Sequence, residues 1–458
     1  QSLGFEPGAS GNLCRVIGVS LLVLLYAGFS GLWGVVATDF FQFFLALLGA
    51  IVVAIAAVNS VGGMDNLVRL VQDATDRDVL SFVPLSFNNG LQWSALASIP
   101  ASTFLAYVFL QWWTFRRSDG GGEFIQRLVA TKTEAEAEKA AWFFNILHYV
   151  IRTWPWVIVA LAAVVIYPDL SDRELGYPKL MLDFLPPVVL GLVVASLLAA
   201  FMSTVSTLIN WGASYLTNDL YGRFIRPSAS QTELVTAGRL ASVLVTILGA
   251  IAAFFATDVT TVFRLVIAIG TGPGLVLILR WFWWRINAAA ELAAMVAGFV
   301  IGLLTSVVPV LTIENFGLRL LVTSGITTVI WVTAMLLTAP ESDETLNSFY
   351  RRVRPGGPGW ARQELQTGLP PLQDLGVDLQ RVLAALFLLF GAMFAVGGFL
   401  LLQSLTGWIS LLIAVGGWYW LRQIKATLPR TMLRPGLTDM DLEGDLEGDL
   451  DNLSDRKF

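Results

Sequence analysis

Long, uninterrupted apolar stretches recur along this chain, and they constrain its fold more than any other feature. A hydrocarbon core about 30 Å thick is crossed by roughly 20 helical residues, and lipid offers no partner to an unpaired backbone N–H or C=O group. Because the stretches are continuous rather than alternating, they predict an all-α, polytopic membrane protein. Eleven spans are expected, at 14–36, 38–59, 93–113, 142–167, 183–215, 238–256, 261–284, 288–311, 317–338, 380–402 and 404–424.

The composition excludes several other classes of protein. Charged residues make up 14% of the chain, whereas a soluble domain carries about 25%, so lipid is expected to cover much of the surface. The single cysteine, Cys14, excludes an internal disulfide framework. With only one histidine beside it, a zinc or haem cofactor is not expected. The net charge of −5 gives no support for a nucleic-acid partner, and the absence of a visible nucleophile–base set argues against an enzyme.

Lysine and arginine gather in alternate loops, which orients the chain by the positive-inside rule. We expect a multi-pass protein of the inner or plasma membrane with its C-terminus in the cytoplasm. The expected divisions are an outside start at 1–13, about nine spans over 14–338, a cytoplasmic loop at 339–379, two spans over 380–424 and a cytoplasmic tail at 425–458.

Two stretches outside the spans have patterns of their own. DNLVRLVQDATDRDVLSFV, residues 65–83, predicts an amphipathic helix on the outer surface. The tail contains DLEGDLEGDL, which is acidic and glycine-spaced, so we expect it to be disordered.

The fifth span is unusually polar for a membrane helix, and its polar residues share one face. Small and hydroxyl-bearing or amide side chains recur at helical spacing at Ala200, Ser203, Thr204, Thr207, Asn210 and Ser214. A hydroxyl pair, with the carbonyl of a small residue three positions earlier, can offer neutral oxygens to a hard cation such as sodium. Two structural alternatives remain: the hydroxyls bond back to carbonyls one turn earlier, or they join neighbouring helices.

Several segments resemble the sodium:solute symporter family. AAFMSTVSTLINWGASYLTNDLYGRF (199–224) resembles the family signature, including its Asp–aliphatic–Tyr ending. GLWGVVATDFFQFFLALLGA (31–50) resembles its Thr–Asp motif with a nearby glutamine, and GGGEFIQRLVATKTEAEAEKAAWF (120–143) its Gln–Arg loop. GTGPGLVLILRWFWWRINAAAELAAM (270–295) resembles the tenth core helix and the helix after it, and ESDETLNSFYRRVRPGGPGW (341–360) resembles bacterial members.

The resemblance implies a LeuT-type core of two inverted five-helix repeats. The chain would hold core helices four to ten and about four helices after them. Core helices one to three would lie upstream of Gln1, so this chain is expected to be truncated and not to transport as it stands.

The implied function is symport of a small organic solute with sodium by alternating access, with no other cofactor. A membrane ligand sensor built on a transporter-like core and a passive channel are the alternatives. Sugar carriers of the family have an Asn–Gln stretch before the Gln–Arg pair, which RRSDGGGEFIQR lacks, so a hexose is disfavoured and amino acids, organic acids and small vitamins stay open.

The resemblance also suggests residues for the ion. The family's sodium site would use the carbonyl of Ala200 and the hydroxyls of Ser203 and Thr204. It gives the position of Asp39 a part in the intracellular ion path, for which Thr207 is a further candidate. Alternatively, Thr38 and Asp39 cap a helix start at the interface.

Two further features are candidates for the solute pocket or for gating. Arg152 lies within the fourth span, where a charge is costly and needs a partner; solute contact and a structural pairing both stay open. Gly270, Gly272 and Pro273 loosen the seventh span. They predict either a hinge beside a cavity or close packing of helices through small residues.

Overall fold

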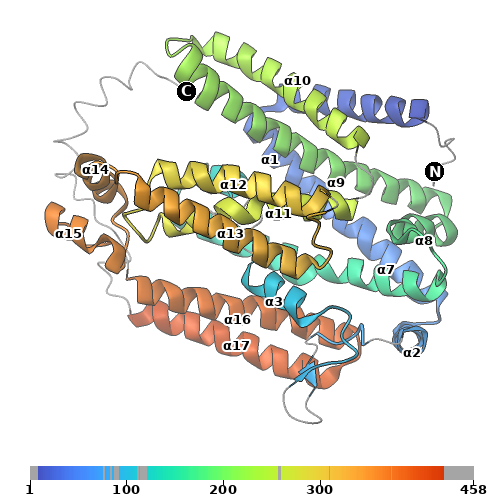
Figure 1. Ribbon diagram of the computed structural model, residues 1–458. Helices are drawn as coiled ribbons and strands as arrows, with labels where there is room; N and C mark the ends of the chain where they lie inside the picture. The colour runs from blue at the N-terminus through green and yellow to red at the C-terminus, as the bar shows by residue number, and fades with distance from the viewer. Residues whose placement is uncertain are drawn as a thin grey trace.

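The computed structural model describes residues 9–75, 78–82, 85–86, 92–110, 113, 121–255, 259–308, 310–372 and 374–427. Within these residues, nine helical segments are long and apolar enough to cross a membrane. Figure 1 shows most of the long helices running side by side. The prediction of an all-helical, polytopic membrane protein is therefore confirmed, with nine candidate spans in the described part of the chain where eleven were expected over the whole.

The long helices account for most of the described residues. They are α1 (Ala9–Ser60), α6 (Glu134–Asn145) continued by η1 (Ile146–Ile151) and α7 (Thr153–Ile166), α9 (Pro187–Ser214) continued by η3 (Tyr215–Ile225), α10 (Gln231–Phe255), α11 (Val259–Leu279), α12 (Ala288–Val307), α13 (Phe316–Leu337), α16 (Leu375–Leu400) and α17 (Ser404–Thr427). Between them lie α2 (Met64–Ala74), β1 (Leu85–Ser86), β2 (Gln92–Trp93), α3 (Ala101–Phe109), α5 (Gly122–Val129), η2 (Arg173–Leu175), α8 (Gly176–Phe184), α14 (Asp343–Val353), η4 (Pro358–Trp360) and α15 (Ala361–Thr367).

The first two predicted spans fall within the single helix α1. We expected a helix boundary at residue 37, but the helix runs through it because GLWGVVAT contains no proline to remove a backbone donor. The described part of α1 that qualifies as a span is Val35–Ser60. Most side chains of the predicted span 14–36 lie outside the described residues.

The predicted span 93–113 is wrong as a continuous helix. Residues 94–100 form turns, and α3 begins only after Pro100, whose backbone is extended. The nine residues of α3 are too few to cross a bilayer. Before it, β1 and β2 form an antiparallel pair in which Leu85 faces Trp93.

The predicted amphipathic helix exists over α2 but ends early. Leu67 and Val71 are fully buried against α7, while the opposite face is exposed. The helix ends at Ala74, where Thr75 turns to an extended backbone and its hydroxyl donates to the Val71 carbonyl. The acidic tail beyond Thr427 lies outside the described residues.

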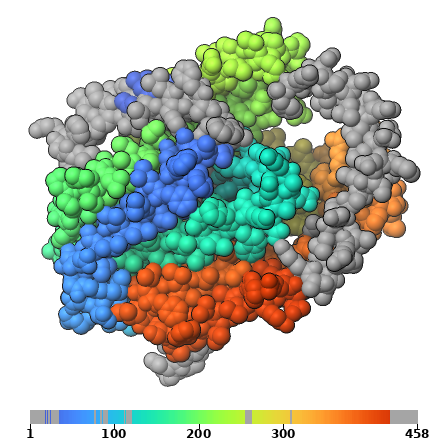
Figure 2. Space-filling view, turned by 180° about the vertical axis from the view of Figure 1, so that it is seen from behind, coloured from blue at the N-terminus to red at the C-terminus, as the bar shows by residue number. Residues whose placement is uncertain are grey.

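Small residues bring the long helices close together. A Cβ built on Gly49 of α1 would lie 2.1 Å from the Ser196 Oγ of α9, so these two helices touch at that point. Gly398 of α16 packs in the same way against the backbone of Gly407 of α17. Figure 2 shows α1 in blue beside α9 in green, with α16 and α17 in orange-red below them. The contact of α1 with α9 positions the polar cluster described next.

The loop expected at 339–379 contains a small folded unit, which we call the helical cap (residues 341–372). Here α14, η4 and α15 surround Leu346, Tyr350 and Trp360, all buried. The indole of Trp360 donates to the Trp281 carbonyl at 2.9 Å, just beyond the end of α11.

Candidate functional site

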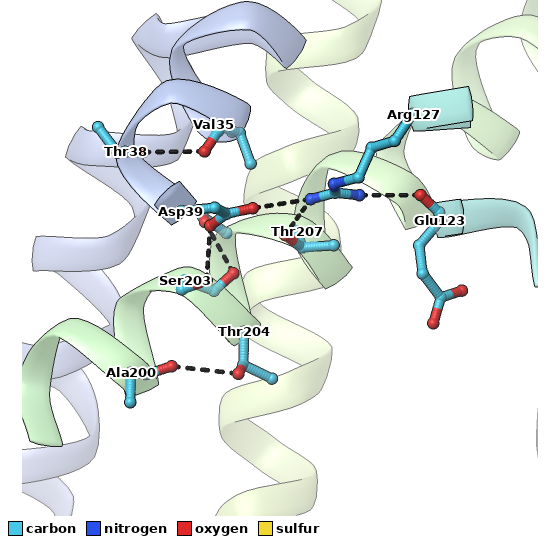
Figure 3. A network of polar contacts seen from close by, with 10 residues as sticks. Val35, Thr38, Asp39, Glu123, Arg127, Ala200, Ser203, Thr204 and Thr207 are labelled. Carbon is cyan, nitrogen blue, oxygen red and sulfur yellow. Dashed lines mark hydrogen bonds and ion pairs between the residues drawn. The ribbon is translucent and has the colours of Figure 1, made fainter. Parts of the chain in front are cut away.

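A polar cluster joins three elements that are far apart in the sequence. Ser203 lies on the polar face of α9, and its hydroxyl donates to the Asp39 Oδ1 of α1 at 2.5 Å. Both side chains are partly buried. Figure 3 shows these two residues pointing toward each other, with Thr207 one turn farther along α9. The sequence placed Asp39, Ser203 and Thr207 as ion-handling candidates, and the fold brings them together.

The third element is α5, which contributes Arg127. Its Nη2 lies 2.8 Å from Asp39 Oδ2 and 3.1 Å from Thr207 Oγ1. Its Nη1 donates to the Glu123 carbonyl one turn earlier in α5, at 2.9 Å, which fixes the guanidinium in this place. The ion pair is partly shielded from water, since the Arg127 and Asp39 side chains are 27% and 21% exposed.

Asp39 is not a helix cap. It lies inside α1, and the Thr38 hydroxyl donates to the Val35 carbonyl at 3.0 Å, as a hydroxyl inside a helix does, whereas an N-cap hydroxyl would accept from a backbone N–H at the helix start. A carboxylate inside an apolar span is costly unless it is paired. Arg127 and Ser203 supply that pairing, so the N-cap interpretation of these two residues does not hold.

The two other predicted sodium ligands lie one turn from each other on α9. The Thr204 hydroxyl donates to the Ala200 carbonyl at 3.1 Å, so both oxygens lie close enough to contact one cation. The same hydrogen bond, from a hydroxyl to the carbonyl one turn earlier, is also what the first structural alternative predicts. Thr204 is exposed, whereas Ser203 faces Asp39, so the two adjacent hydroxyls serve different neighbours.

Arg152 lies where the helix from Glu134 to Ile166 changes from π-helical to α-helical hydrogen bonding. It follows the π-helix η1, a feature that is frequent at functional sites. Its Nη1 lies 3.1 Å from His148 Nδ1, one turn earlier. Among the ion pairs and hydrogen bonds of the described residues, none joins Arg152 to a carboxylate or to the Asp39 cluster.

The segment from Gly270 to Pro273 remains within a continuous helix. Pro273 lies inside α11, and Gly272 packs against the backbone of α12 at Gly298. Thr271 is buried and its hydroxyl donates to the Ile267 carbonyl at 2.8 Å. The residues thus form a close helix contact. No hydrogen bond or ion pair in the described part of the chain links them to Asp39.

The sequence patterns by themselves assign no functional role to Arg127. The sequence held two signals for it: the Gln–Arg pair of the loop after residue 120, and the need of Asp39 for a counter-charge inside a span. The pairing itself spans 88 residues, so no local pattern could have identified it.

The chain is similar in sequence to sodium-coupled cotransporters. The sodium/glucose cotransporter of Vibrio parahaemolyticus is 28% identical over 316 residues, which cover 64% of this chain and 57% of that protein. Sodium/myo-inositol cotransporter 2 of Rattus norvegicus is 26% identical over 327 residues, covering 63% and 46%. The chain therefore spans about half the length of the curated relatives it matches.

The fold supports the same relationship. A substrate-bound, outward-open Na⁺-coupled sialic acid symporter has a similar structure, with a TM-score of 0.56 and 21% identity. The likeness covers 74% of this chain and 68% of that one. The sequence model of the sodium:solute symporter family matches residues 13–298, more than half of the chain, and includes Asp39, Arg127 and the polar face of α9. This chain belongs to the sodium:solute symporter family.

Proposed function

We propose that the chain forms the ion-handling part of a secondary active transporter that carries a small organic solute together with sodium by alternating access. In this proposal Val35–Ser60 acts as core helix five of a LeuT-type fold, α9 with η3 as core helix eight and α11 as core helix ten. The first part of the helical cap, residues 341–360, resembles bacterial members and favours a bacterial branch of the family. The Lys and Arg distribution puts α5 and the cap on the cytoplasmic side.

One observation carries the proposal. Two hydroxyls of the polar face of α9 lie at the charged pair between α1 and α5, where Ser203 donates to Asp39 and Thr207 accepts from Arg127. Hydroxyls that only joined helices would need no carboxylate opposite them. Neutral oxygens beside one shielded negative charge are suited to a hard monovalent cation that has lost its water shell.

Ala200, Ser203 and Thr204 would hold the sodium ion, and Asp39 with Thr207 would lie on its path toward the cytoplasm. The Thr204 hydroxyl would turn from the Ala200 carbonyl so that both oxygens point at the ion. Ser203 can rotate between the ion and Asp39. The site would then be linked to the cytoplasmic path through a single hydroxyl.

Arg152 would line the solute path. Arg152 lies within the candidate span Glu134–Ile166, is exposed, and has no carboxylate partner among the described residues, so its charge is open to a ligand. A solute that carries a carboxylate would supply the counter-charge and two acceptor oxygens. This favours amino acids and organic acids among the solute classes left open. Two relatives transport glucose or myo-inositol by name, so polyols belong in any test.

The test begins with the full-length gene product in detergent. Its thermal unfolding would be followed with a library of amino acids, organic acids, vitamins, hexoses and inositols, in sodium and in choline buffer. We expect one solute class to raise the unfolding midpoint in sodium only. Uptake of that solute into proteoliposomes should then saturate and require an inward sodium gradient.

The double variant Ser203→Ala, Thr204→Ala provides the decisive comparison. It should remain folded and lose sodium-stimulated uptake. Thr236→Ala is a matched control, because its hydroxyl donates to the Thr232 carbonyl on the exposed start of α10. Undiminished uptake in the double variant would refute the sodium assignment. Flux without saturation or sodium dependence would indicate a channel, and binding without flux would indicate a sensor.

A further inference from the structure

Arg127 occupies the position at which a cation passing Asp39 would have to be held. One nitrogen of its guanidinium contacts Asp39 Oδ2 and Thr207 Oγ1, and the other is fixed on the Glu123 carbonyl. The second carboxylate oxygen of Asp39 accepts from Ser203. Both carboxylate oxygens of Asp39 and the Thr207 hydroxyl therefore already have a partner within the cluster, as Figure 3 shows.

Charge prevents Asp39 from serving both cations at once. The guanidinium keeps its positive charge at any pH a cell experiences, so it cannot leave as a neutral group. Sodium beside the Arg127–Asp39 pair would place two positive charges at one carboxylate in a partly shielded place, which is unfavourable. The two cations must therefore exclude one another at the carboxylate.

We propose that Arg127 is a tethered cation that exchanges with sodium at Asp39 and closes the ion path when sodium is absent. The inference rests on the sodium transport proposed above. When sodium reaches Asp39 on its way to the cytoplasm, the guanidinium withdraws and frees the Asp39 and Thr207 oxygens. When sodium has left, Arg127 returns and neutralises the empty site.

The position of α5 suits this exchange. Its first residue, Gly122, packs against the Trp211 indole of α9, where an added Cβ would lie 2.7 Å from Nε1. Trp211 is four residues beyond Thr207, so α5 touches α9 at both of its ends. The helix has only eight residues. It can therefore loosen at the Arg127 end while Gly122 stays in place, without disturbing a long helix.

The exchange explains how an empty carrier could avoid leakage. A free carboxylate in the path would attract another sodium ion from the cytoplasm and hold it. The tethered guanidinium neutralises Asp39 without leaving the protein, so it keeps the carboxylate from recapturing sodium. Arg127 thus acts as a positioning residue for sodium release.

The first experiment measures equilibrium binding of radioactive sodium to the full-length gene product, with choline as the replacing cation. The variants are Arg127→Gln, Arg127→Lys, Asp39→Asn and the double variant Asp39→Asn, Arg127→Gln. Arg69→Gln is a matched control, because it also removes an arginine from an ion pair, with Asp73, but on the exposed face of α2.

Removing the competing cation should strengthen sodium binding. We expect Arg127→Gln to lower the sodium Kd by about tenfold and to slow sodium release from preloaded proteoliposomes. Arg127→Lys should fall between wild type and Arg127→Gln, since a lysine keeps the charge but cannot hold both Asp39 and the Glu123 carbonyl through a rigid fork. In the Asp39→Asn background the same change at 127 should bring no gain in binding.

The second experiment needs no variant. Sodium should speed hydrogen–deuterium exchange of the α5 amides in the wild-type protein, because it displaces the side chain that holds α5 against α1. Hydrogen–deuterium exchange of the α2 amides should not change when sodium is added. This measurement keeps the inference falsifiable if Arg127→Gln fails to fold.

The outcomes separate the inference from the function it rests on. If the wild-type protein binds no sodium, both the proposed function and the exchange at Asp39 are wrong. If it binds sodium but folded Arg127→Gln binds it equally or more weakly, only the exchange is wrong. The proposed cation exchange would also be overturned if Arg127→Gln strengthened sodium binding equally in the Asp39→Asn background. Hydrogen–deuterium exchange of α5 that does not change with sodium would overturn it as well.

Discussion

Gly272 of α11 lies directly against Gly298 of α12, and each occupies the space that a Cβ of the other would need. A Cβ built on Gly272 would lie 2.3 Å from the Gly298 Cα, and one built on Gly298 would lie 2.7 Å from the Gly272 Cα. Both neighbours are backbone atoms, which cannot rotate away. Tight packing of small residues is a principal source of helix association inside a bilayer.

Gly272→Ala should therefore destabilise the protein. Overpacking costs about 1–3 kcal/mol when neighbours cannot yield, and the higher helix propensity of alanine recovers only about 1 kcal/mol. We expect a lower thermal unfolding midpoint in detergent. Gly325→Ala in α13 is the control, since nothing lies within 4 Å of the added Cβ, and its midpoint should stay level or rise. Unchanged stability with impaired transport would instead favour a hinge at Gly272 and Pro273.

The sequence was sufficient to predict the helical class and the polar face of α9, because both depend on local patterns. A hydrophobic run of span length and the helical spacing from Ala200 to Thr207 are each contained within one helix. Neither needs information about tertiary contacts. Pro186 precedes the first residue of α9, as a proline at a helix start should. The family motifs added Asp39, which a hydrophobic pattern alone would leave as an unexplained charge.

The parts that failed depend on distant contacts or on breaks that hydropathy ignores. Residues 93–113 are apolar enough for a span, yet the turns after Trp93 and the extended Pro100 reduce the helix to α3. The pairing of Arg127 with Asp39 requires α5 to dock on α1 across 88 residues. The sequence did not predict the helical cap, because its buried residues depend on a distant part of the chain. Trp360, for example, contacts the end of α11.

Arg152→Gln tests the proposed preference for a carboxylated solute. Hydrogen bonds to charged groups contribute about 1.5–3 kcal/mol, so the variant should bind such a solute roughly ten- to a hundredfold more weakly. Arg152→Lys should retain part of the affinity, because it keeps the charge without the planar fork. The measurement is the solute concentration that half-maximally raises the unfolding midpoint in sodium buffer.

Removal of this charge should not harm folding. A neutral residue at mid-span avoids an insertion cost of about 2.5–3.5 kcal/mol, so Arg152→Gln should unfold at the same temperature as wild type or higher. A clear loss of stability would indicate that the contact with His148 is structural. Equal affinity for carboxylated solutes in both proteins would contradict the role in the solute path.

Trp360→Ala should detach the helical cap from the end of α11. The side chain is 3% exposed, and its Nε1 donates to the Trp281 carbonyl at 2.9 Å. Replacing a buried tryptophan by alanine costs about 3–5 kcal/mol, more than a small unit can absorb. Limited proteolysis should cut within 341–372, and hydrogen exchange there should accelerate while α16 stays protected.

The exposed ion pair of the cap provides the comparison. Arg362 contacts Asp343 at 2.8 Å, and both side chains are about half exposed. Exposed pairs contribute only about 0–1 kcal/mol, so Arg362→Gln should leave the proteolysis pattern close to wild type. If Arg362→Gln exposes the cap as fully as Trp360→Ala, charge rather than burial holds the cap in place.

Tyr177 should make the fold sensitive to alkaline pH. The residue is the second of α8, stacks on Trp156 at 4.6 Å between ring centroids, and has a buried hydroxyl without a hydrogen-bond partner among the described residues. Burial raises the pKa of Tyr177 from 10.0 to about 12. The folded state therefore holds the phenolic proton more tightly than the unfolded state, so this contribution to stability is complete below pH 10 and is lost as the pH rises through about 12.

Tyr177→Phe keeps the stack and removes both the unpaired hydroxyl and the titration. Its unfolding midpoint should equal or exceed that of wild type near neutral pH and should fall less between pH 10 and 12. A parallel decline in the two proteins, measured in the same detergent, would show that other groups control the alkaline loss.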